Sequence, residues 1–260
     1  MAQTISVLSL KGGTGKTTTV RTLTDVFRRL GLDVLAIDLD PQGNLSDYFD
    51  VPPDASPTVA DVLAGNAKIK DATHDGVVPA SPILAEVERS LSGKMGRELV
   101  LRKALKDARK QHDIVLIDCP PALGLLTING LVASDWALIS SEAQYFALQG
   151  VNGALEVIEQ AKEYYNDDLE FLGVVMNIAD MRTVHSREAY EALREHFGDR
   201  VFETVIRSSI AYAESAESGR SILDHRPDLG RDYLALADEV LKRIKLTGWR
   251  RKLAPLLEAA

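Results

Sequence analysis

Seven short runs of branched apolar residues, separated by longer amphipathic stretches, limit the folds open to this chain more than any other feature of its sequence. Runs of this length, alternating with helical periodicity, are typical of a mostly parallel sheet covered by helices on both faces. The expected strands cover residues 5–10, 34–37, 77–78, 114–117, 137–139, 171–176 and 202–206. We therefore predict an α/β fold, in which ligands bind at the carboxyl ends of the strands.

Apolar residues at helical spacing predict the helices that cover this sheet. Residues with this spacing are Val151, Leu155 and Ile158, and later Leu236, Val240, Leu241 and Ile244. Residues 51–57 contain three prolines and are expected to form a surface connection, after which Thr58 caps a helix over residues 59–63. No Gly/Ser-rich or Pro-rich linker divides the 260 residues, so we predict a single domain.

A glycine-rich segment directly follows the first expected strand and precedes a helix. It consists of Lys11, Gly12, Gly13, Thr14, Gly15, Lys16, Thr17 and Thr18. In such a turn, backbone N–H groups converge on phosphate oxygens, and the amino end of the helix adds its positive dipole. We expect Lys16 to reach the β and γ phosphates of a nucleotide and the Thr17 hydroxyl to ligate Mg²⁺. The general pattern G-x-x-x-x-G-K-[ST] fails only at its first glycine, where Leu10 stands, and an extra lysine follows at Lys11.

This lysine before two glycines makes the segment similar to the phosphate loop of the deviant Walker A ATPases of the ParA/MinD group. The resemblance implies a single P-loop NTPase domain that binds ATP and Mg²⁺ through the segment from Lys11 to Thr18. It also implies that Lys11 reaches the phosphates of a partner subunit across a nucleotide-sandwiched homodimer. A cation supplied in trans makes hydrolysis depend on dimerisation, as an arginine finger does. Lys11 and Lys16 are therefore candidate catalytic residues.

Carboxylates follow two of the expected strands, at Asp38 and Asp40 and again at Asp118. Magnesium takes one or two carboxylates beside phosphate oxygens, so acids at these strand ends suit a nucleotide site. Residues 119–129, CPPALGLLTIN, resemble the corresponding motif of the ParA/Soj family. That resemblance implies that Asp40 is catalytic and orients the attacking water. It assigns the metal site to Thr17, Asp38 and Asp118, and it implies that Gln42, Gly43 and residues 120–124 sense the γ-phosphate.

The similarity continues through residues 142–149, 177–182 and 201–206. Asn177 stands where the family contacts adenine. After Ile206 the family has proline, arginine and asparagine, whereas this chain has Arg207, Ser208 and Ser209. Arg207 is therefore a candidate nucleotide contact, in a segment beside the adenine that departs from the family pattern.

Charge bears on nucleic-acid binding in two opposite ways. With 30 Lys and Arg against 38 Asp and Glu, the net charge of -8 excludes a uniformly basic DNA-binding surface. The resemblance nevertheless implies non-specific DNA binding, because Arg182 matches one arginine that the family uses. A basic cluster near the end of the chain adds candidates at Lys242, Arg243, Lys245, Arg250 and Arg251. The same cluster is equally consistent with a solvated helix end. We assign residues 1–247 to the ATPase domain and residues 248–260 to a short basic tail.

The leading interpretation is a ParA-type ATPase that positions a chromosome, plasmid or organelle by cycles of ATP hydrolysis. It implies a homodimer with ATP, non-specific DNA, a ParB-like or other adaptor protein, and a cytoplasmic, nucleoid-associated location. Few residues precede the first strand, so we expect no amino-terminal helix-turn-helix. The alternative is a MinD-like membrane regulator, because Trp249 and Leu253 accompany the basic tail, but Pro255 interrupts this segment and membrane binding is not favoured.

A third interpretation is a biosynthetic enzyme built on the same scaffold, such as an amide-forming ligase. We identify no residues that would bind its substrate. Cys119 is the only cysteine, so a disulfide framework and a cluster bound by several cysteines of one chain are excluded. No histidine is placed in sequence to activate this thiol, and we predict a structural role for it.

Overall fold

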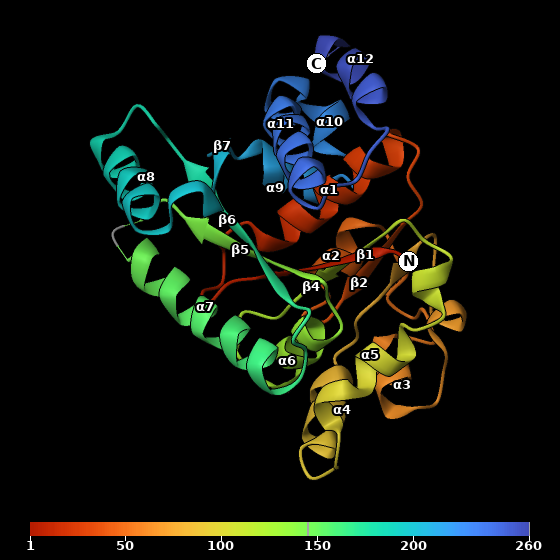
Figure 1. The fold of residues 1–260 in the computed structure, drawn as a ribbon. Helices are drawn as coiled ribbons and strands as arrows, with labels where there is room; N and C mark the ends of the chain where they lie inside the picture. The colour runs from red at the N-terminus through yellow and green to blue at the C-terminus, as the bar shows by residue number, and fades with distance from the viewer. Residues whose placement is uncertain (145, 260) are drawn as a thin grey trace.

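The computed structural model describes residues 1–144 and 146–259; Tyr145 and Ala260, which fall in the predicted domain and tail, lie outside the described residues. Within the described chain, seven parallel strands form one sheet in the order β3-β2-β4-β1-β5-β6-β7 (Figure 1). The strands are β1 (Gln3–Leu8), β2 (Val34–Asp38), β3 (Val77–Val78), β4 (Ile114–Asp118), β5 (Trp136–Glu142), β6 (Glu170–Ala179) and β7 (Val201–Arg207). The predicted α/β fold is confirmed.

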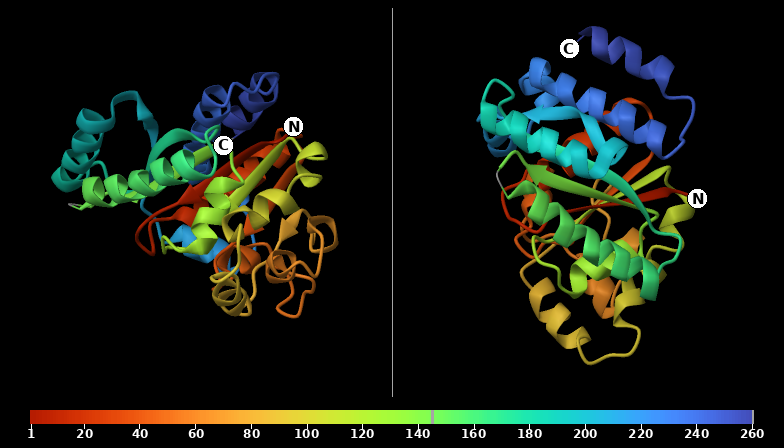
Figure 2. Two further views of the ribbon diagram at one scale, coloured as in Figure 1. Left: turned by 60° about the horizontal axis from the view of Figure 1, so that its bottom comes forward. Right: turned by 60° about the vertical axis from the view of Figure 1, so that its left-hand side comes forward.

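Helices cover both faces of the sheet, as the two further views in Figure 2 show. One face carries α1 (Lys16–Arg29), α2 (Asn44–Tyr48), α9 (Ala211–Glu217), α10 (Ile222–His225), α11 (Pro227–Arg243) and α12 (Arg250–Ala259). The other carries α3 (Val59–Ala64), α4 (Leu84–Leu91), α5 (Val100–Ala104), α6 (Leu125–Val132), α7 (Ala147–Tyr164) and α8 (Val184–Phe197). Successive side chains of a strand point to opposite faces of the sheet, so each strand contributes to both cores. In β2, Val34 and Ala36 join one core, while Leu35 and Ile37 join the other.

Strand β1 ends at Leu8, two residues before the predicted end. The difference has a local cause, because the chain leaves the sheet at Ser9 and the Ser9 hydroxyl donates to the carbonyl of Lys11 at 2.8 Å. The glycine-rich segment thus begins as a turn directly at the edge of the sheet. The predicted cap at Thr58 is confirmed: its hydroxyl accepts from the N–H of Ala60, and Asp61 accepts from the N–H of Thr58.

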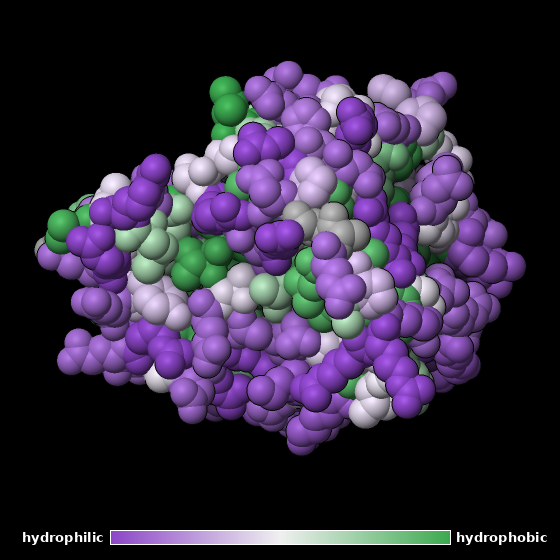
Figure 3. All heavy atoms as spheres, turned by 90° about the horizontal axis from the view of Figure 1, so that it is seen from above, coloured by the Kyte–Doolittle hydropathy of each residue, from purple (hydrophilic) through white to green (hydrophobic). Residues whose placement is uncertain are grey.

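The end of the chain packs on the domain through apolar side chains of helix α12 and the residue before it. Trp249 and Leu253 are 4% and 2% exposed and belong to the same core as α1 and α11. A Cβ added at Gly31, just after α1, would lie 2.9 Å from the Lys252 ammonium nitrogen. The basic residues lie outward, and Figure 3 shows a mainly hydrophilic surface on this side of the molecule.

Replacing Leu253 by alanine tests this packing. We expect Leu253→Ala to lower the free energy of unfolding by about 2–3 kcal/mol, because it removes a buried side chain and leaves a cavity. Leu257→Ala on the same helix is the matched control, since Leu257 is 38% exposed, and it should change stability by less than about 0.5 kcal/mol. Urea unfolding measures both values. Equal stability of the two variants would show that α12 is not part of the folded core.

Candidate functional site

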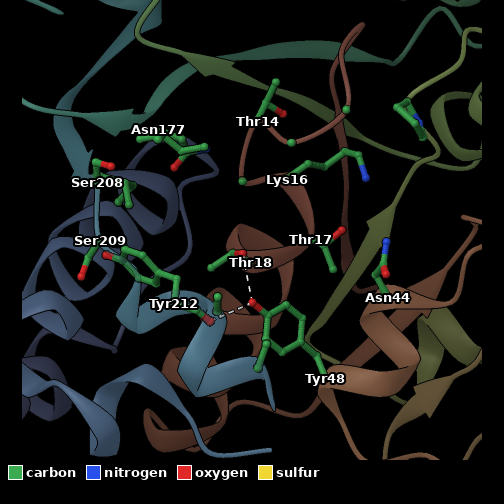
Figure 4. A pocket seen from close by; sticks show the side chains of 18 of the residues that line it. Thr14, Lys16, Thr17, Thr18, Asn44, Tyr48, Asn177, Ser208, Ser209 and Tyr212 are labelled. Carbon is green, nitrogen blue, oxygen red and sulfur yellow. Dashed lines mark hydrogen bonds between the residues drawn. The ribbon is translucent and has the colours of Figure 1, made fainter. Parts of the chain in front are cut away.

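A cleft of about 770 Å³ opens at the carboxyl ends of the strands. The glycine-rich segment lines one part of it (Figure 4). Its other residues come from the turn into α2 and α2 itself, from the segment after β4, from the end of β6, from the β7–α9 region and from α11: Asp40, Gln42, Asn44, Asp47, Tyr48, Pro121, Asn177, Ile178, Ile206, Arg207, Ser208, Ser209, Tyr212, Ala213, Ala216, Glu217 and Tyr233. The parallel sheet therefore gathers residues that are more than 200 positions apart along the sequence.

Backbone conformation at two glycines shapes the loop at the mouth of this cleft. Gly13 and Gly15 have φ angles of 78° and 77°, in the left-handed region that side chains disfavour. A Cβ at Gly15 would also meet Asn177 at 3.3 Å, so the loop packs closely against the end of β6. Helix α1 begins directly afterwards at Lys16, with its amino end at the cleft. This is the strand-loop-helix arrangement that binds phosphate.

Two side chains of the loop hold a fully buried carboxylate behind the cleft. Lys16 Nζ lies 2.8 Å from Asp118 Oδ1, and the Thr17 hydroxyl donates to Asp118 Oδ2 at 2.7 Å. Burial alone would lower the pKa of Lys16, but the Asp118 carboxylate more than offsets it, so this pKa is raised. The structure thus brings together three residues that the sequence assigned separately to phosphate and metal.

Asp40 and Asp38 occupy different depths, although only one residue separates them. Asp40 lines the cleft, and its carboxylate accepts from the backbone N–H of Gln42 at 3.0 Å. Asp38 is fully buried and accepts from the N–H of Asp40 and from both the N–H and the hydroxyl of Ser46. Burial and the nearby Asp118 raise the pKa of Asp38 to about 7. Asp38 does not line the cleft; its contacts fix the turn that presents Asp40.

Lys11 lies at the rim, where the Lys11 side chain is 65% exposed. Its ammonium donates to Gln144 Oε1 at 2.5 Å and lies 3.7 Å from a carboxylate oxygen of Glu142. Glu142 is the last residue of β5 and Gln144 follows it, so Lys11 is bound to the end of β5, whereas Lys16 is bound to the end of β4. Neither contact was predicted from the sequence, because nothing in the spacing of Lys11, Glu142 and Gln144 indicates that they meet.

Another wall of the cleft is formed by the end of β6, which packs against the phosphate loop, and by the segment after β7. Asn177 is 1% exposed; its amide nitrogen donates to the Ser140 hydroxyl at 2.7 Å, while Oδ1 has no hydrogen-bond partner among the described residues. Ile178 has a φ of 54°, which is unfavourable for a β-branched residue. Such a backbone conformation persists only where the surrounding structure enforces it. Arg207 lines the cleft but is tied to Asp232, with Nε 2.8 Å from Oδ2.

Three tyrosines of the cleft, Tyr48, Tyr212 and Tyr233, were not singled out from the sequence. Tyr48, at the end of α2, donates its hydroxyl to the carbonyl oxygen of Tyr212 at 3.1 Å, and the same hydroxyl lies 3.4 Å from the Thr18 hydroxyl (Figure 4). Tyr212 itself packs edge-on against Tyr233 with ring centroids 6.0 Å apart. Sequence reasoning had no signal for Tyr48, because aromatic residues in a short helix are usually core residues.

The candidate DNA-binding residues do not form one surface. Arg182 follows the carboxyl end of β6 and forms two hydrogen bonds to Asp180, both at 2.8 Å. Arg243 contacts the first residues of β6 and β7 at the opposite edge of the sheet. Its guanidinium donates to the carbonyls of Leu172 and Val201 and stacks 3.8 Å over the Phe202 ring. These contacts engage Arg243 in the fold, whereas Lys242, Lys245, Arg250 and Arg251 are exposed near that same edge.

The thiol of Cys119 is fully buried beneath the site. Burial raises the pKa of Cys119 to about 12, so the nucleophilic thiolate form is suppressed at neutral pH. A Cβ added at Gly130 of α6 would lie 2.9 Å from its sulfur. The surroundings of Cys119 are those of a packing residue, in agreement with the structural role expected for it.

The residues of the cleft fit a nucleotide with magnesium. Thr14 Oγ1 and Asn177 Oδ1 are buried polar atoms without a partner in the described chain, one in the loop and one at the end of β6 beside it. Added Cβ atoms at Gly12 and Gly13 would meet nothing within 4 Å, which leaves the loop backbone accessible to phosphate oxygens. The Thr17 hydroxyl in the cleft and the Asp118 carboxylate directly behind it are hard oxygen groups of the kind that Mg²⁺ prefers.

Comparison with known proteins identifies the family. An AAA-domain family model matches residues 2–171. The sporulation initiation inhibitor protein Soj of Bacillus subtilis is 35% identical over 249 residues, covering 92% of this chain and 98% of the relative. The chromosome-partitioning ATPase Soj of Thermus thermophilus is 37% identical over 247 residues, covering 93% and 96%.

Solved structures agree with this grouping. An ATP complex of Cyanothece McdA superposes with a TM-score of 0.83 at 25% identity, covering 95% of this chain and 98% of the other. The cobyrinic acid a,c-diamide synthase of Mycobacterium smegmatis with ADP and magnesium gives a TM-score of 0.76 at 33% identity, covering 86% and 95%. Together with the matching loop and strand-end carboxylates, these relatives show that the chain belongs to the ParA/Soj family of P-loop ATPases.

Proposed function

We propose that this chain is a ParA-type partitioning ATPase that binds ATP and Mg²⁺ in the cleft and forms a sandwich dimer through Lys11. The dimer holds nucleoid DNA non-specifically in the cytoplasm, and a ParB-like or other adaptor stimulates hydrolysis, so that a chromosome, plasmid or organelle is positioned. Residues 1–247 form the ATPase domain and residues 248–260 the basic tail in this proposal. The observation that carries it is the exposed Lys11 at the rim of a complete phosphate loop.

The residues of the cleft divide the work of hydrolysis. Backbone N–H groups from Gly12 to Thr18 hold the phosphates, and Lys16 exchanges Asp118 for a phosphate oxygen. Thr17 and Asp118 would hold magnesium, with Asp38 supporting this metal site from behind, and the ion would neutralise charge on the phosphates. Asp40 orients the attacking water, and Asp38 keeps the Asp40 turn in place through the hydrogen bond from the Asp40 N–H.

Two other functions are alternatives to this proposal, and the structure presents an obstacle to the first, a membrane anchor. No helix in the described part of the chain is both long and apolar enough to cross a bilayer. For a MinD-like anchor, Trp249 and Leu253 would have to leave the domain core. Sedimentation with anionic liposomes and ATP distinguishes this alternative. The second alternative is an amide-forming ligase, because the chain is similar to a diamide synthase. Such an enzyme would release phosphate only when a small carboxylic acid is added, and neither DNA nor a protein partner would be required.

Removing the Lys11 ammonium tests the dimerisation step. We expect Lys11→Ala to remain monomeric with ATP, to bind DNA no better than the ADP form, and to lose adaptor-stimulated hydrolysis by about 10³-fold, because a trans cation is missing from the phosphoryl-transfer site. Light scattering and DNA shift assays at graded salt measure these effects. Lys70→Ala is the matched control, because Lys70 is an exposed lysine that does not line the cleft. Equal DNA binding by the ATP form, the ADP form and Lys11→Ala would show that nucleotide-dependent dimerisation does not control DNA binding.

Replacing Asp40 separates nucleotide binding from hydrolysis. Asp40→Ala should bind ATP, stay dimeric and stay on DNA, because the loop is intact while the carboxylate that orients water is absent. ADP release measured by chromatography should be at background level. Asp54→Ala, an exposed acid in the surface connection, serves as the control and should hydrolyse ATP normally. Rapid accumulation of ADP by Asp40→Ala would contradict the role given to Asp40.

The two separated sets of basic residues lead to different expectations for DNA. Arg250→Ala combined with Arg251→Ala should weaken DNA binding by the ATP dimer. It should also reduce the slope of log affinity against log salt by about two for each subunit engaged. Arg182→Ala should have a smaller effect, because Asp180 already neutralises this guanidinium. Filter binding at several salt concentrations measures both slopes. A larger loss of DNA affinity in Arg182→Ala than in the double variant would show instead that DNA contacts the side of the molecule where the strands end.

A further inference from the structure

The hydroxyl of Tyr48 occupies a defined position along the cleft. It lies between Thr18, the last residue of the phosphate loop, and the backbone of Tyr212, in the wall formed after β7. In Figure 4, Lys16 and Thr17 lie on one side of this hydroxyl, and Asn177 and Ser208 lie on the other. A nucleotide bound with its phosphates on the loop and its base toward the segment after β7, at Ser208 and Ser209, would place its sugar close to Tyr48.

Hydrogen-bond polarity changes along the same line. At the loop, backbone N–H groups and Lys16 offer donors, which match phosphate oxygens because these only accept. A phenol donates one proton and accepts at its oxygen, and the proton of Tyr48 is used on the Tyr212 carbonyl. The Tyr48 oxygen can therefore only accept a further hydrogen bond. In the free protein the Thr18 hydroxyl, 3.4 Å away, is the donor that it meets, and a ribose hydroxyl would replace this long contact. The carboxylates of Asp47 and Glu217, which also line the cleft, only accept as well.

An acceptor-rich wall suits the part of a nucleotide that donates hydrogen bonds. Ribose hydroxyls are donors, whereas a deoxyribose carbon at the same position is not. We infer that Tyr48 is a specificity-determining residue that accepts a hydrogen bond from a ribose hydroxyl, so that the cleft selects ribonucleotides over deoxyribonucleotides. The inference rests on the proposed ATPase function, and it adds the sugar to what that function recognises.

Calorimetric titration with diphosphates provides the test, because ADP is not turned over. The probes are ADP, 2′-deoxy-ADP and 3′-deoxy-ADP, each with Mg²⁺, so the two deoxy compounds identify which hydroxyl is read. For the natural chain we expect ADP to bind about three- to ten-fold more tightly than one or both deoxy compounds, the usual effect of one hydrogen bond. In Tyr48→Phe this ratio should fall to about one.

Tyr190→Phe is the matched control. Tyr190 also donates its hydroxyl to a backbone carbonyl, that of Phe202 at 3.3 Å, but it lies on α8 and does not line the cleft. This variant should keep the full preference for ADP. Tyr48→Phe keeps the aromatic ring, so a purely structural contribution of Tyr48 would change the affinity for all three diphosphates by the same factor and leave their ratio unaltered.

The outcomes separate this inference from the proposed function. If the natural chain binds ADP and both deoxy compounds equally, or if Tyr48→Phe keeps the preference, the inference is wrong while the ATPase function stands. If neither ADP nor ATP binds, both fail. A natural chain that prefers ADP, together with a Tyr48→Phe variant that does not, supports the assignment of Tyr48 even if that variant is somewhat less stable.

Discussion

The buried carboxylate of Asp118 is the interaction on which the site depends. A fully buried charge without partners would cost several kcal/mol, and Lys16 and Thr17 supply an ion pair and a hydrogen bond that offset this cost. These contacts tie the glycine-rich loop to β4, which lies beside β1 and β2 in the sheet. Since the residues that satisfy Asp118 are also those expected to contact phosphate and metal, nucleotide binding must rearrange bonds that stabilise the free protein.

The cleft is organised by hydrogen-bond polarity rather than by shape alone. Donors gather where the amino end of α1 meets the loop, whereas the Tyr48 oxygen and the carboxylates of Asp47 and Glu217 add acceptors on α2 and α9. Tyr48 joins these regions, because α2 directly follows the turn that carries Asp40. In the proposed function, α2 and the turn before it would carry both the sugar contact, at Tyr48, and the carboxylate that orients water, at Asp40. Recognition of the nucleoside and positioning of the water would then be coupled through this short segment without a long-range pathway.

Sequence reasoning worked where the physical signal was local. The periodicity of apolar residues predicted the seven strands, and the order of strand, glycine turn, lysine and hydroxyl predicted the loop at Lys16 and Thr17. It did not predict contacts that depend on how distant segments meet, such as Lys11 with Gln144 or Tyr48 with the backbone of Tyr212. The ion pair that engages Arg207 was missed for the same reason, because Asp232 lies on a helix that only the fold brings to β7.

If the basic tail binds DNA as proposed, its position limits how nucleotide can control that binding. The exposed lysines and arginines around α12 lie near the edge of the sheet where the strands begin, whereas the cleft lies where they end. To change that surface, a conformational change in the phosphate loop would have to be transmitted along the full length of the strands. Dimerisation needs no such path, because pairing two subunits doubles the number of phosphates that can be neutralised, and affinity depends exponentially on that number. The geometry therefore favours control through the number of subunits joined rather than through a change in the shape of either one.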